Sequence, residues 1–289
     1  MIKVSNLRKA FGPIQAVDEV SFEVAKGETF GLLGPNGAGK TTTIGILVGA
    51  QTADSGTVEI EGAGDARSRQ IRKLIGFVPQ SLAIYDELTA EENLKFFGLL
   101  YGMGGSELRD RVAAGLDLSG LTDRAHDRVA TFSGGMKRRL NLACGLVHRP
   151  SVIFLDEPTV GVDPQSRNHI FETIEQLKDH KCTIIYTTHY MEEASRLCDR
   201  IGIMDKGHLL AVDTLDSLVD KCGGESTVKI EFAKPFGAHG ELVKSFKSRS
   251  PFEEVAQFAS LGTELKAVHV ERADLETVFL NLTGRTLRD

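Results

Sequence analysis

Short segments with alternating apolar and polar positions occupy the first 60 residues of the chain. Such alternation is typical of strands that bury one face and expose the other. Glycine-containing segments around residues 10–13 and 25–28 separate them and favour reversals of the chain. The pattern predicts strands over Ile2–Leu7, Val17–Val24 and Thr57–Ile60.

Several continuous apolar runs indicate strands that are buried on both faces. These runs are Thr29–Leu33, Leu74–Val78, Val152–Leu155, Thr183–Tyr186 and Ile201–Met204. A helical pattern, with Ile170, Ile174 and Leu177 on one side, separates two of them. Strands that alternate with helices in this way form parallel sheets covered by helices. The sequence therefore predicts an α/β fold.

Helical patterns dominate between the second and third of these runs. Thr89 and Glu92 have the spacing of a capping box, which predicts a helix that ends at Gly102. Two further helices are expected, over residues 106–118 and 136–147.

The character of the sequence changes after residue 221. A glycine pair within Cys222–Glu225 suggests a boundary, and residues 228–232 alternate as in a half-buried strand. Near the end, a helix is predicted to begin after Asp274 and to end at Gly284. We expect a main domain over residues 1–220 and a small α/β accessory domain over residues 222–289.

Bulk properties narrow the classes of function. The chain has 289 residues, 34 basic against 40 acidic side chains and a net charge of −6, so we expect no nucleic-acid partner. Its four cysteines lie far apart and its histidines lack metal-binding spacing, which predicts reduced thiols and no structural metal. Because no apolar stretch is long enough to span a bilayer, a membrane role would require a partner.

Residues 34–42 have a strong chemical signal of their own. They match the phosphate-loop pattern G-x-x-x-x-G-K-[ST] and lie between a buried strand and a helical pattern. Glycines let backbone N–H groups approach phosphate oxygens, Lys40 adds positive charge and Thr41 offers a hydroxyl to Mg²⁺. A helix beginning near Lys40 would direct the positive end of its dipole at the same phosphates. The predicted nucleotide-binding residues are Gly34, Pro35, Asn36, Gly37, Ala38, Gly39, Lys40, Thr41 and Thr42.

Polar side chains follow three of the buried runs. They are Gln80, the pair Asp156 and Glu157, and His189. Parallel strands bring their carboxyl ends to one edge, where open α/β sheets bind ligands. One acid can hold the Mg²⁺ that bridges two phosphates, and the second can position or deprotonate an attacking water. His189 can hydrogen-bond the γ-phosphate, and Gln80 can reach the metal or the water. Their joint placement predicts hydrolysis, although the two acids alone are also compatible with a solvated loop.

Three weaker features are open to two interpretations each. Ser133-Gly134-Gly135 opens a predicted helix and is either a second anion site or a plain helix N-cap. The basic residues 137–139 behind it are expected on a solvated helix face, with a phosphate clamp as the alternative. Phe11, expected in a loop before the second strand, either stacks on a base or packs in the core.

In this order, the motifs resemble those of the ATP-binding subunit of ABC transporters over roughly residues 1–220. The matches are residues 34–42 with Walker A, Gln80 with the Q-loop, 132–136 with the signature, 152–157 with Walker B, 161–163 with the D-loop, His189 with the switch histidine and Phe11 with the adenine-stacking aromatic. The signature departs from the common Leu-Ser-Gly-Gly-Gln at Phe132 and Met136, and Met136 lacks the glutamine's polar side chain. The Met-Lys-Arg-Arg continuation and residues 274–280 are similar to the drug-resistance and ABC-2 type exporters.

The resemblance implies a P-loop NTPase (RecA-like) core, an N-terminal antiparallel β subdomain, a helical subdomain over about residues 81–140 and a C-terminal α/β appendage. It also implies that two copies pair head-to-tail, with each ATP between Walker A of one and Ser133–Gly135 of the other. Thr41, Gln80 and Asp156 would hold Mg²⁺, Glu157 would be the general base, and His189 and Lys40 would stabilise γ-phosphate charge. The implied nucleotide contacts outside Walker A are Phe11, Gln80, Ser133, Gly134, Gly135 and Asp163.

The same resemblance implies partners and a location. Integral-membrane permease subunits would dock near residues 81–130 and hold the chain at the cytoplasmic face of the cell membrane. ATP would close the dimer, and hydrolysis would reopen it. An alternative is a soluble ABC ATPase acting on ribosomes or DNA, but neither a second cassette nor a long coiled-coil insertion is present. A third, a regulatory module without turnover, is disfavoured by Glu157 and His189.

Overall fold

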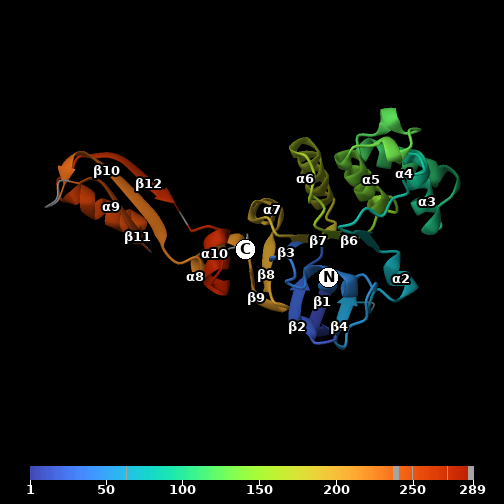
Figure 1. Cartoon of the computed structure of the whole chain (residues 1–289), viewed down its shortest axis with the longest axis horizontal. Coiled ribbons are helices and arrows are strands. Elements are labelled where there is room, and N and C mark those ends of the chain that lie inside the picture. The colour runs from blue at the N-terminus through green and yellow to red at the C-terminus, as the bar shows by residue number, and fades with distance from the viewer. Residues whose placement is uncertain (63, 237–240, 249, 272, 286–289) are drawn as a thin grey trace. The chain divides into compact units, whose positions relative to one another are not determined.

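The computed structural model describes residues 1–62, 64–236, 241–248, 250–271 and 273–285 (Figure 1). The chain divides into two compact units, Met1–Val212 and Asp213–Asp289. This division lies several residues before the boundary expected at 221. The reason is that α8 (Leu215–Cys222) packs on α10 (Leu275–Thr283) and so belongs to the second unit.

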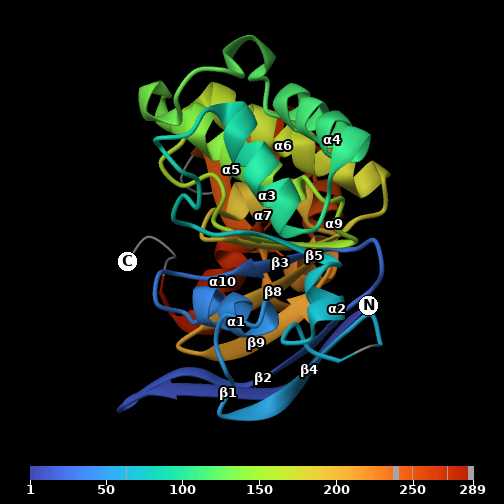
Figure 2. The same ribbon diagram turned by 90° about the vertical axis from the view of Figure 1, so that its right-hand side faces the viewer.

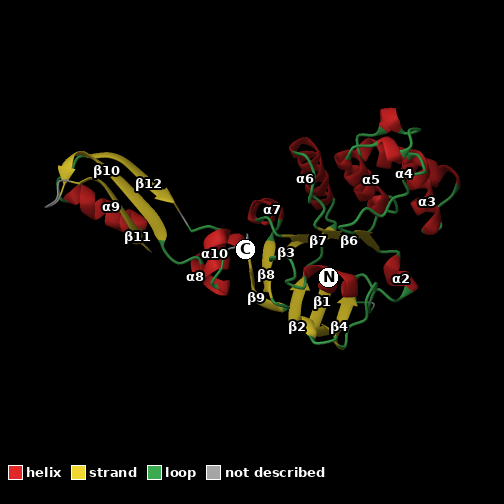
Figure 3. Cartoon of the chain, in the orientation of Figure 1, coloured by secondary structure: helices red, strands yellow, loops and turns green. Residues whose placement is uncertain are grey.

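The first unit contains an antiparallel sheet of three strands. They are β1 (Ile2–Phe11), β2 (Ile14–Val24) and β4 (Ser55–Ile60), in the order β2-β1-β4 (Figure 3). The first strand continues beyond its predicted end at Leu7. Only Gly12 and Pro13 form the turn, and Gly12 takes the left-handed φ of 58° that a tight reversal requires.

A second sheet of six strands forms the centre of this unit. The strands are β3 (Thr29–Leu33), β5 (Ile75–Val78), β6 (Val152–Asp156), β7 (Thr183–Thr188), β8 (Arg200–Asp205) and β9 (His208–Asp213). Their order is β5-β6-β7-β3-β8-β9, and the pairs from β5 to β8 are parallel. Each predicted buried run forms one of these strands, so the parallel α/β sheet is confirmed.

The helices of the first unit belong to two groups. The first group consists of α1 (Lys40–Leu47), α2 (Arg69–Arg72), α6 (Pro164–Asp179) and α7 (Met191–Leu197). The second consists of α3 (Ala90–Leu100), α4 (Gly105–Leu118) and α5 (Gly134–Leu146), with 3₁₀ turns at Thr122–Arg124 and Val129–Thr131. The predicted capping box of Thr89 and Glu92 is present. No helix in the described part of the chain combines the length and apolar character that a membrane span needs.

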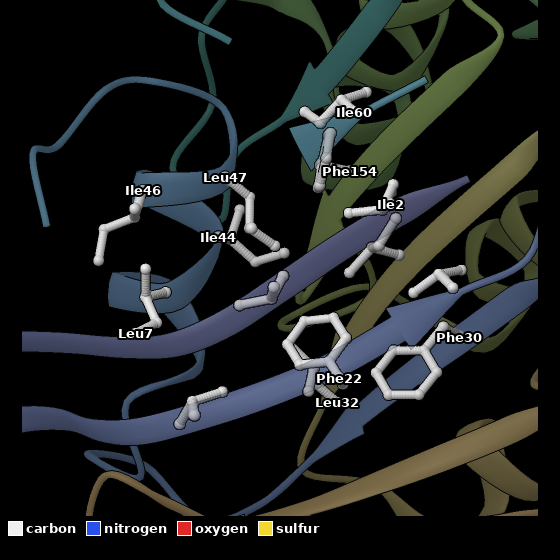
Figure 4. Close-up of a cluster of buried hydrophobic side chains, with 14 of the residues drawn as sticks. Ile2, Leu7, Phe22, Phe30, Leu32, Ile44, Ile46, Leu47, Ile60 and Phe154 are labelled. Carbon is white, nitrogen blue, oxygen red and sulfur yellow. The ribbon is translucent and has the colours of Figure 1, made fainter. Parts of the chain in front are cut away.

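Helix α1 is held between the two sheets. Its Ile44 and Leu47 are fully buried against residues of both, including Ile2 and Phe154 (Figure 4). Phe22 from the antiparallel sheet stacks on Phe30 from the parallel sheet, with ring centroids 4.9 Å apart. Burial of this kind contributes about 2 kcal/mol per large side chain. The phosphate-loop segment that precedes α1 is therefore attached to a rigid core.

Helices α3 to α6 lie on the other side of the central sheet (Figure 2). Side chains alternate along a strand, so Ile153 and Leu155 of β6 point away from α1 and pack with α5 and α6. A further cluster joins α3, α4 and α5 through Leu94, Leu116 and Leu140.

The second unit contains a small sheet and a helix pair. The sheet has the order β11-β10-β12, from β10 (Ser226–Phe236), β11 (Glu241–Ser248) and β12 (Leu265–Glu271). Val228, Ile230 and Phe232 form its buried side with α9 (Pro251–Ser260). Asp274 caps α10 and Gly284 ends it, as predicted.

Candidate active site

The loop between β3 and α1 can only be built with glycine at two positions. A Cβ at Gly34 would lie 2.3 Å from the Met204 carbonyl oxygen, and one at Gly39 would lie 2.3 Å from the Ala16 carbonyl oxygen. Gly39 also has a φ of 102°, which side chains rarely tolerate. The backbone of neighbouring strands therefore supports the loop at contact distance and fixes its course.

Helix α1 begins at Lys40, as predicted, without a side-chain cap at Gly39. The first N–H groups of a helix have no intrahelical partner, so these donors are available to an anion. The Lys40 side chain is only 4% exposed, and its Nζ donates to the carbonyl oxygens of Gly34 (2.7 Å) and Pro35 (3.0 Å). The loop thus surrounds its own lysine and holds the ammonium at its centre.

Glu157 brings together the polar residues of three strand ends. Its Oε1 lies 3.0 Å from Lys40 Nζ, and its Oε2 accepts a hydrogen bond of 3.3 Å from Gln80 Nε2. His189 Nδ1 lies 3.2 Å from the same Oε2. The carboxylate is 4% exposed. The predicted convergence of these side chains at one edge of the sheet is therefore present.

The backbone of Glu157 adopts a conformation that the sequence does not indicate. Its φ of 45° lies in the left-handed region, which is costly for a residue with a side chain. Its amide donates to the Thr187 hydroxyl at 2.9 Å and lies 3.2 Å from the Thr187 carbonyl oxygen. These bonds stabilise a strained turn, and strain maintained in this way is common at functional sites.

Asp156 is the last residue of β6 and is 1% exposed. Its Oδ1 accepts hydrogen bonds from the hydroxyls of Thr187 (2.7 Å) and Thr41 (3.3 Å). Burial raises the pKa of the Asp156 carboxyl, and these two hydrogen bonds oppose the change. A nearby cation would stabilise the buried carboxylate. The Thr41 hydroxyl, the Asp156 carboxylate and the Gln80 amide oxygen form the hard oxygen donor set that Mg²⁺ prefers, so these residues fit the predicted metal.

A cavity of about 650 Å³ lies over the phosphate loop. Residues 36–42, Gln80 and Glu157 line it, as the sequence predicts. Four further lining residues carried no recognisable sequence signal. They are Ile14, Gln15, Ala16 and Lys206. Ile14 is 66% exposed and offers an apolar surface beside the loop, whereas Lys206 adds a second cation.

Phe11 is placed differently from its predicted position. It ends β1 instead of lying in a loop, and it pairs across the hairpin with Ile14. Its ring is 49% exposed, so it does not pack in the core, and it is not among the residues that line the cavity. Lys9 Nζ lies 5.4 Å from the ring centroid.

The start of α5 forms a separate cluster with the start of α6. The Ser133 hydroxyl accepts from the Met136 amide at 3.2 Å, so Ser133 is the N-cap of α5. A Cβ at Gly135 would lie 2.1 Å from Ser166 Oγ and 2.5 Å from Asp163 Oδ2. Asp163 itself caps α6. Its carboxylate accepts a hydrogen bond from the Ser166 amide, and this bond lowers the pKa of the Asp163 carboxyl. Neither Ser133–Gly135 nor Asp163 lines the phosphate-loop cavity.

The expectation of a solvated basic face over residues 137–139 is wrong. Arg138 is 7% exposed and donates to the carbonyl oxygens of Gln80 (2.7 Å), Pro79 (3.3 Å) and Val160 (3.4 Å). The physical reason is that α5 faces irregular backbone whose carbonyl groups need donors. Arg138 therefore links α5 to the segments that carry Gln80 and Glu157.

Comparisons with known proteins agree with this geometry. A family model described as ABC transporter matches residues 17–160. The linearmycin resistance ATP-binding protein of Bacillus subtilis (strain 168) is 42% identical over 311 residues, which cover 100% of both chains. The Nod factor export ATP-binding protein I of Sinorhizobium fredii is 38% identical over 300 residues, covering 100% of this chain and 87% of the relative.

Solved structures give the same result for the fold. An ATP-binding subunit of an ABC transporter superposes with a TM-score of 0.69 and 30% identity, covering 75% of this chain and 91% of the other. A dimeric ATP-binding cassette in a post-hydrolysis state, bound to ADP and Pi, superposes with a TM-score of 0.68 and 27% identity, covering 74% and 98%. The chain therefore belongs to the ABC transporter family, as one of its ATP-binding ATPases.

Proposed function

We propose that this ATPase powers an exporter by pairing head-to-tail with a second copy of itself on separate membrane permease subunits. One observation carries the proposal: Lys40, Gln80 and His189 all reach the buried carboxylate of Glu157, at 3.0, 3.3 and 3.2 Å. A phosphate-binding loop needs no such acid to bind nucleotide. A base held beside the loop's lysine is suited to hydrolysis.

In the proposed site each residue has a defined task. Lys40 and the N–H groups of residues 37–42 bind the phosphates, and Thr41, Gln80 and Asp156 hold Mg²⁺, which would neutralise phosphate charge. Glu157 orients the attacking water and accepts its proton, while His189 donates a hydrogen bond to the γ-phosphate. ATP binding must break the ion pair of Lys40 with Glu157, because phosphate oxygens replace the Glu157 carboxylate beside the Lys40 ammonium. That exchange frees the carboxylate for its role as base.

The second half of the site comes, in this proposal, from Ser133–Gly135 of the partner copy. Gly134 is exposed, and no described atom beyond its own helix and chain neighbours lies within 4 Å of a Cβ built there. Since neither this segment nor Asp163 lines the cavity of its own chain, both are free to contact a nucleotide held elsewhere. The dimeric state of the similar post-hydrolysis cassette is consistent with this arrangement.

The helical region near residues 81–130 is the proposed docking surface for the permease. Large apolar side chains are exposed there, at Leu82 (42%), Tyr85 (45%), Leu99 (59%) and Leu100 (65%). A docked partner would cover these exposed apolar side chains. The names of the relatives, which describe linearmycin resistance and Nod factor export, support export as the direction of transport. Docking on a permease would place the chain at the cytoplasmic face of the membrane.

The Glu157→Gln variant tests the proposed base. Its turnover of ATP is expected to fall at least about hundredfold, because a general base contributes 10²–10⁴-fold, while ATP affinity is retained. Steady-state phosphate release and equilibrium ATP binding measure the two quantities. Glu172→Gln, on the exposed side of α6, removes one carboxylate at a distance and is the matched control. Normal turnover in Glu157→Gln would remove Glu157 from this role.

A further inference from the structure

Glu193 is a buried acid with no part in the site described above. It lies on α7 and is only 2% exposed. Its Oε1 accepts a hydrogen bond of 2.7 Å from the Thr159 hydroxyl. Its Oε2 accepts two more, of 2.8 Å from the Tyr186 hydroxyl and of 2.7 Å from the Thr188 hydroxyl. A buried carboxylate is costly unless it is fully hydrogen-bonded, and this one receives three donors.

Two of the three donors belong to the segments that carry the catalytic groups. Thr159 follows Glu157 by two residues, in the loop after β6. Thr188 ends β7 and immediately precedes His189. The Glu193 side chain therefore connects the loop after Glu157 to the strand end before His189. Glu157 and His189 are themselves in contact at 3.2 Å.

The hydrogen-bond directions make the connection specific for a carboxylate. The Thr188 hydroxyl accepts from the Tyr190 amide at 2.9 Å, so its own proton is donated to Glu193. That pair of bonds fixes the turn of residues 188–190, which has His189 at its centre. Because both oxygens of Glu193 act only as acceptors, an amide in its place would present an NH₂ group to at least one of these hydroxyl donors.

A cation completes the environment of Glu193. Arg167 Nε lies 3.7 Å from Oε1, and the Arg167 guanidinium lies 5.2 Å from the centroid of the Tyr190 ring. Arg167 is on α6, whose first turn Asp163 caps. The network thus includes α6 as well as the two loops.

We propose that Glu193 is a positioning residue for ATP hydrolysis. Its hydrogen bonds fix the distance between the loop after Glu157 and the turn around His189, so that the Glu157 carboxylate and the His189 ring stay in contact. Glu193 itself touches no nucleotide. The proposal rests on the roles proposed above for Glu157 and His189. It predicts that loss of Glu193 lowers kcat and leaves ATP binding intact, because the phosphate loop is attached to the core through α1.

The test compares four variants by kcat, KM for ATP and the midpoint of thermal unfolding. In Glu193→Gln and Thr188→Val, kcat is expected to fall at least about tenfold with KM within about threefold, since a shift of 1 Å can reduce a rate 10²-fold. Thr188→Ser retains the hydroxyl and is expected to restore kcat to within about twofold. Tyr186→Phe removes a donor that lies within strand β7, so it lowers the midpoint while kcat stays within about twofold.

Three outcomes would overturn the proposal. The first is a Glu193→Gln or Thr188→Val variant whose kcat stays within twofold of the parent. The second is a fall of kcat in Thr188→Ser as large as that in Thr188→Val. The third is a fall of kcat in Tyr186→Phe as large as that in Glu193→Gln. Should Glu193→Gln not fold, the Thr188 pair carries the test. Failure of the proposed function is distinct, because Glu157→Gln would then retain turnover whatever Glu193 does.

Discussion

Helices α1 and α5 both begin with glycine-containing segments, but these two helix starts carry very different groups. Helix α1 starts without a side-chain cap, and its first residue is a buried lysine paired with the acid Glu157. Helix α5 is capped by its own Ser133, and its first residue, Gly134, is exposed. The start of α1 therefore has a cation, a neighbouring carboxylate and a cavity, whereas the start of α5 offers a hydroxyl and backbone amides.

The difference supports a nucleotide site that two copies of the chain share, and not two independent sites within one chain. A complete phosphate site needs charge compensation, which the buried Lys40 provides at the start of α1 and the exposed Gly134 does not provide at the start of α5. Gly135 is pressed against Ser166 and Asp163, so the α5 segment is held in a fixed shape while its outer side remains open. A rigid but incomplete surface is suited to complementing a nucleotide that another copy holds.

The largest effect is expected at α1. Lys40→Ala should weaken ATP binding about hundredfold, because hydrogen bonds to a charged group are worth up to about 3 kcal/mol. The substitution also leaves the buried Glu157 carboxylate without its Lys40 partner, so we expect a lower midpoint of thermal unfolding as well. Titration with ATP and thermal unfolding measure the two effects. Unchanged ATP affinity would refute the phosphate-loop assignment and remove the contrast between the helices.

A smaller effect is expected at α5. Gly134→Asp should lower turnover at least about tenfold, because its carboxylate would face the phosphates of the partner's nucleotide. A Cβ at Gly134 has no described atom within 4 Å beyond its own helix and chain neighbours, and an acid suits a helix start, so folding should be unchanged. Gly104→Asp at the start of α4 is the matched control, since a Cβ there is equally unobstructed. Equal turnover in both variants would contradict a role for α5 in the site.

The smallest effect concerns how α5 is fixed to the central sheet. His148, just beyond this helix, stacks on Tyr101, and its Nε2 donates to the Ile75 carbonyl oxygen at 2.9 Å. Its Nδ1 is buried without a hydrogen-bond partner among the described residues. Burial lowers the pKa of His148 from 6.5 to about 4, with the nearby Arg111 guanidinium adding to the shift.

This lowered pKa predicts a loss of stability in mild acid. Between pH 6.5 and 4 the unfolded chain binds a proton that the folded chain does not, so stability present above pH 6.5 declines towards pH 4. From pH 7.5 to 5.5 the free energy of unfolding should fall by about 1 kcal/mol in urea titrations. In His148→Phe this share of the pH dependence should disappear. If His148→Phe had the same pH dependence as the parent, His148 would bind its proton equally well in the folded and unfolded chains, and the lowered pKa would be wrong.

Most of the fold and the centre of the site were predictable for identifiable reasons. The apolar runs become parallel strands because residues such as Ile153 and Phe154 must be buried on both faces of the sheet. The residues after those runs then meet at one edge, which is why Gln80, Glu157 and His189 converge. Sheet geometry brings these strand ends to the same edge.

What could not be predicted depends on contacts between distant segments. The left-handed backbone of Glu157 follows from its bonds to Thr187, and the burial of Arg138 follows from carbonyl groups that only the folded chain brings to it. The hydroxyls around Glu193 come from two strand regions 27 residues apart, from Thr159 to Tyr186. Neither Arg138 nor Glu193 has a local sequence pattern that differs from that of an ordinary surface position.

The shared site is tested most directly by the mass of the ATP-bound Glu157→Gln variant in sedimentation. With ATP it should sediment as a particle of two chains, and addition of Gly134→Asp to the same variant should return it to a single chain that still binds ATP. A Glu157→Gln protein that binds ATP yet remains a single chain would contradict the account, as would a dimer that Gly134→Asp leaves unchanged.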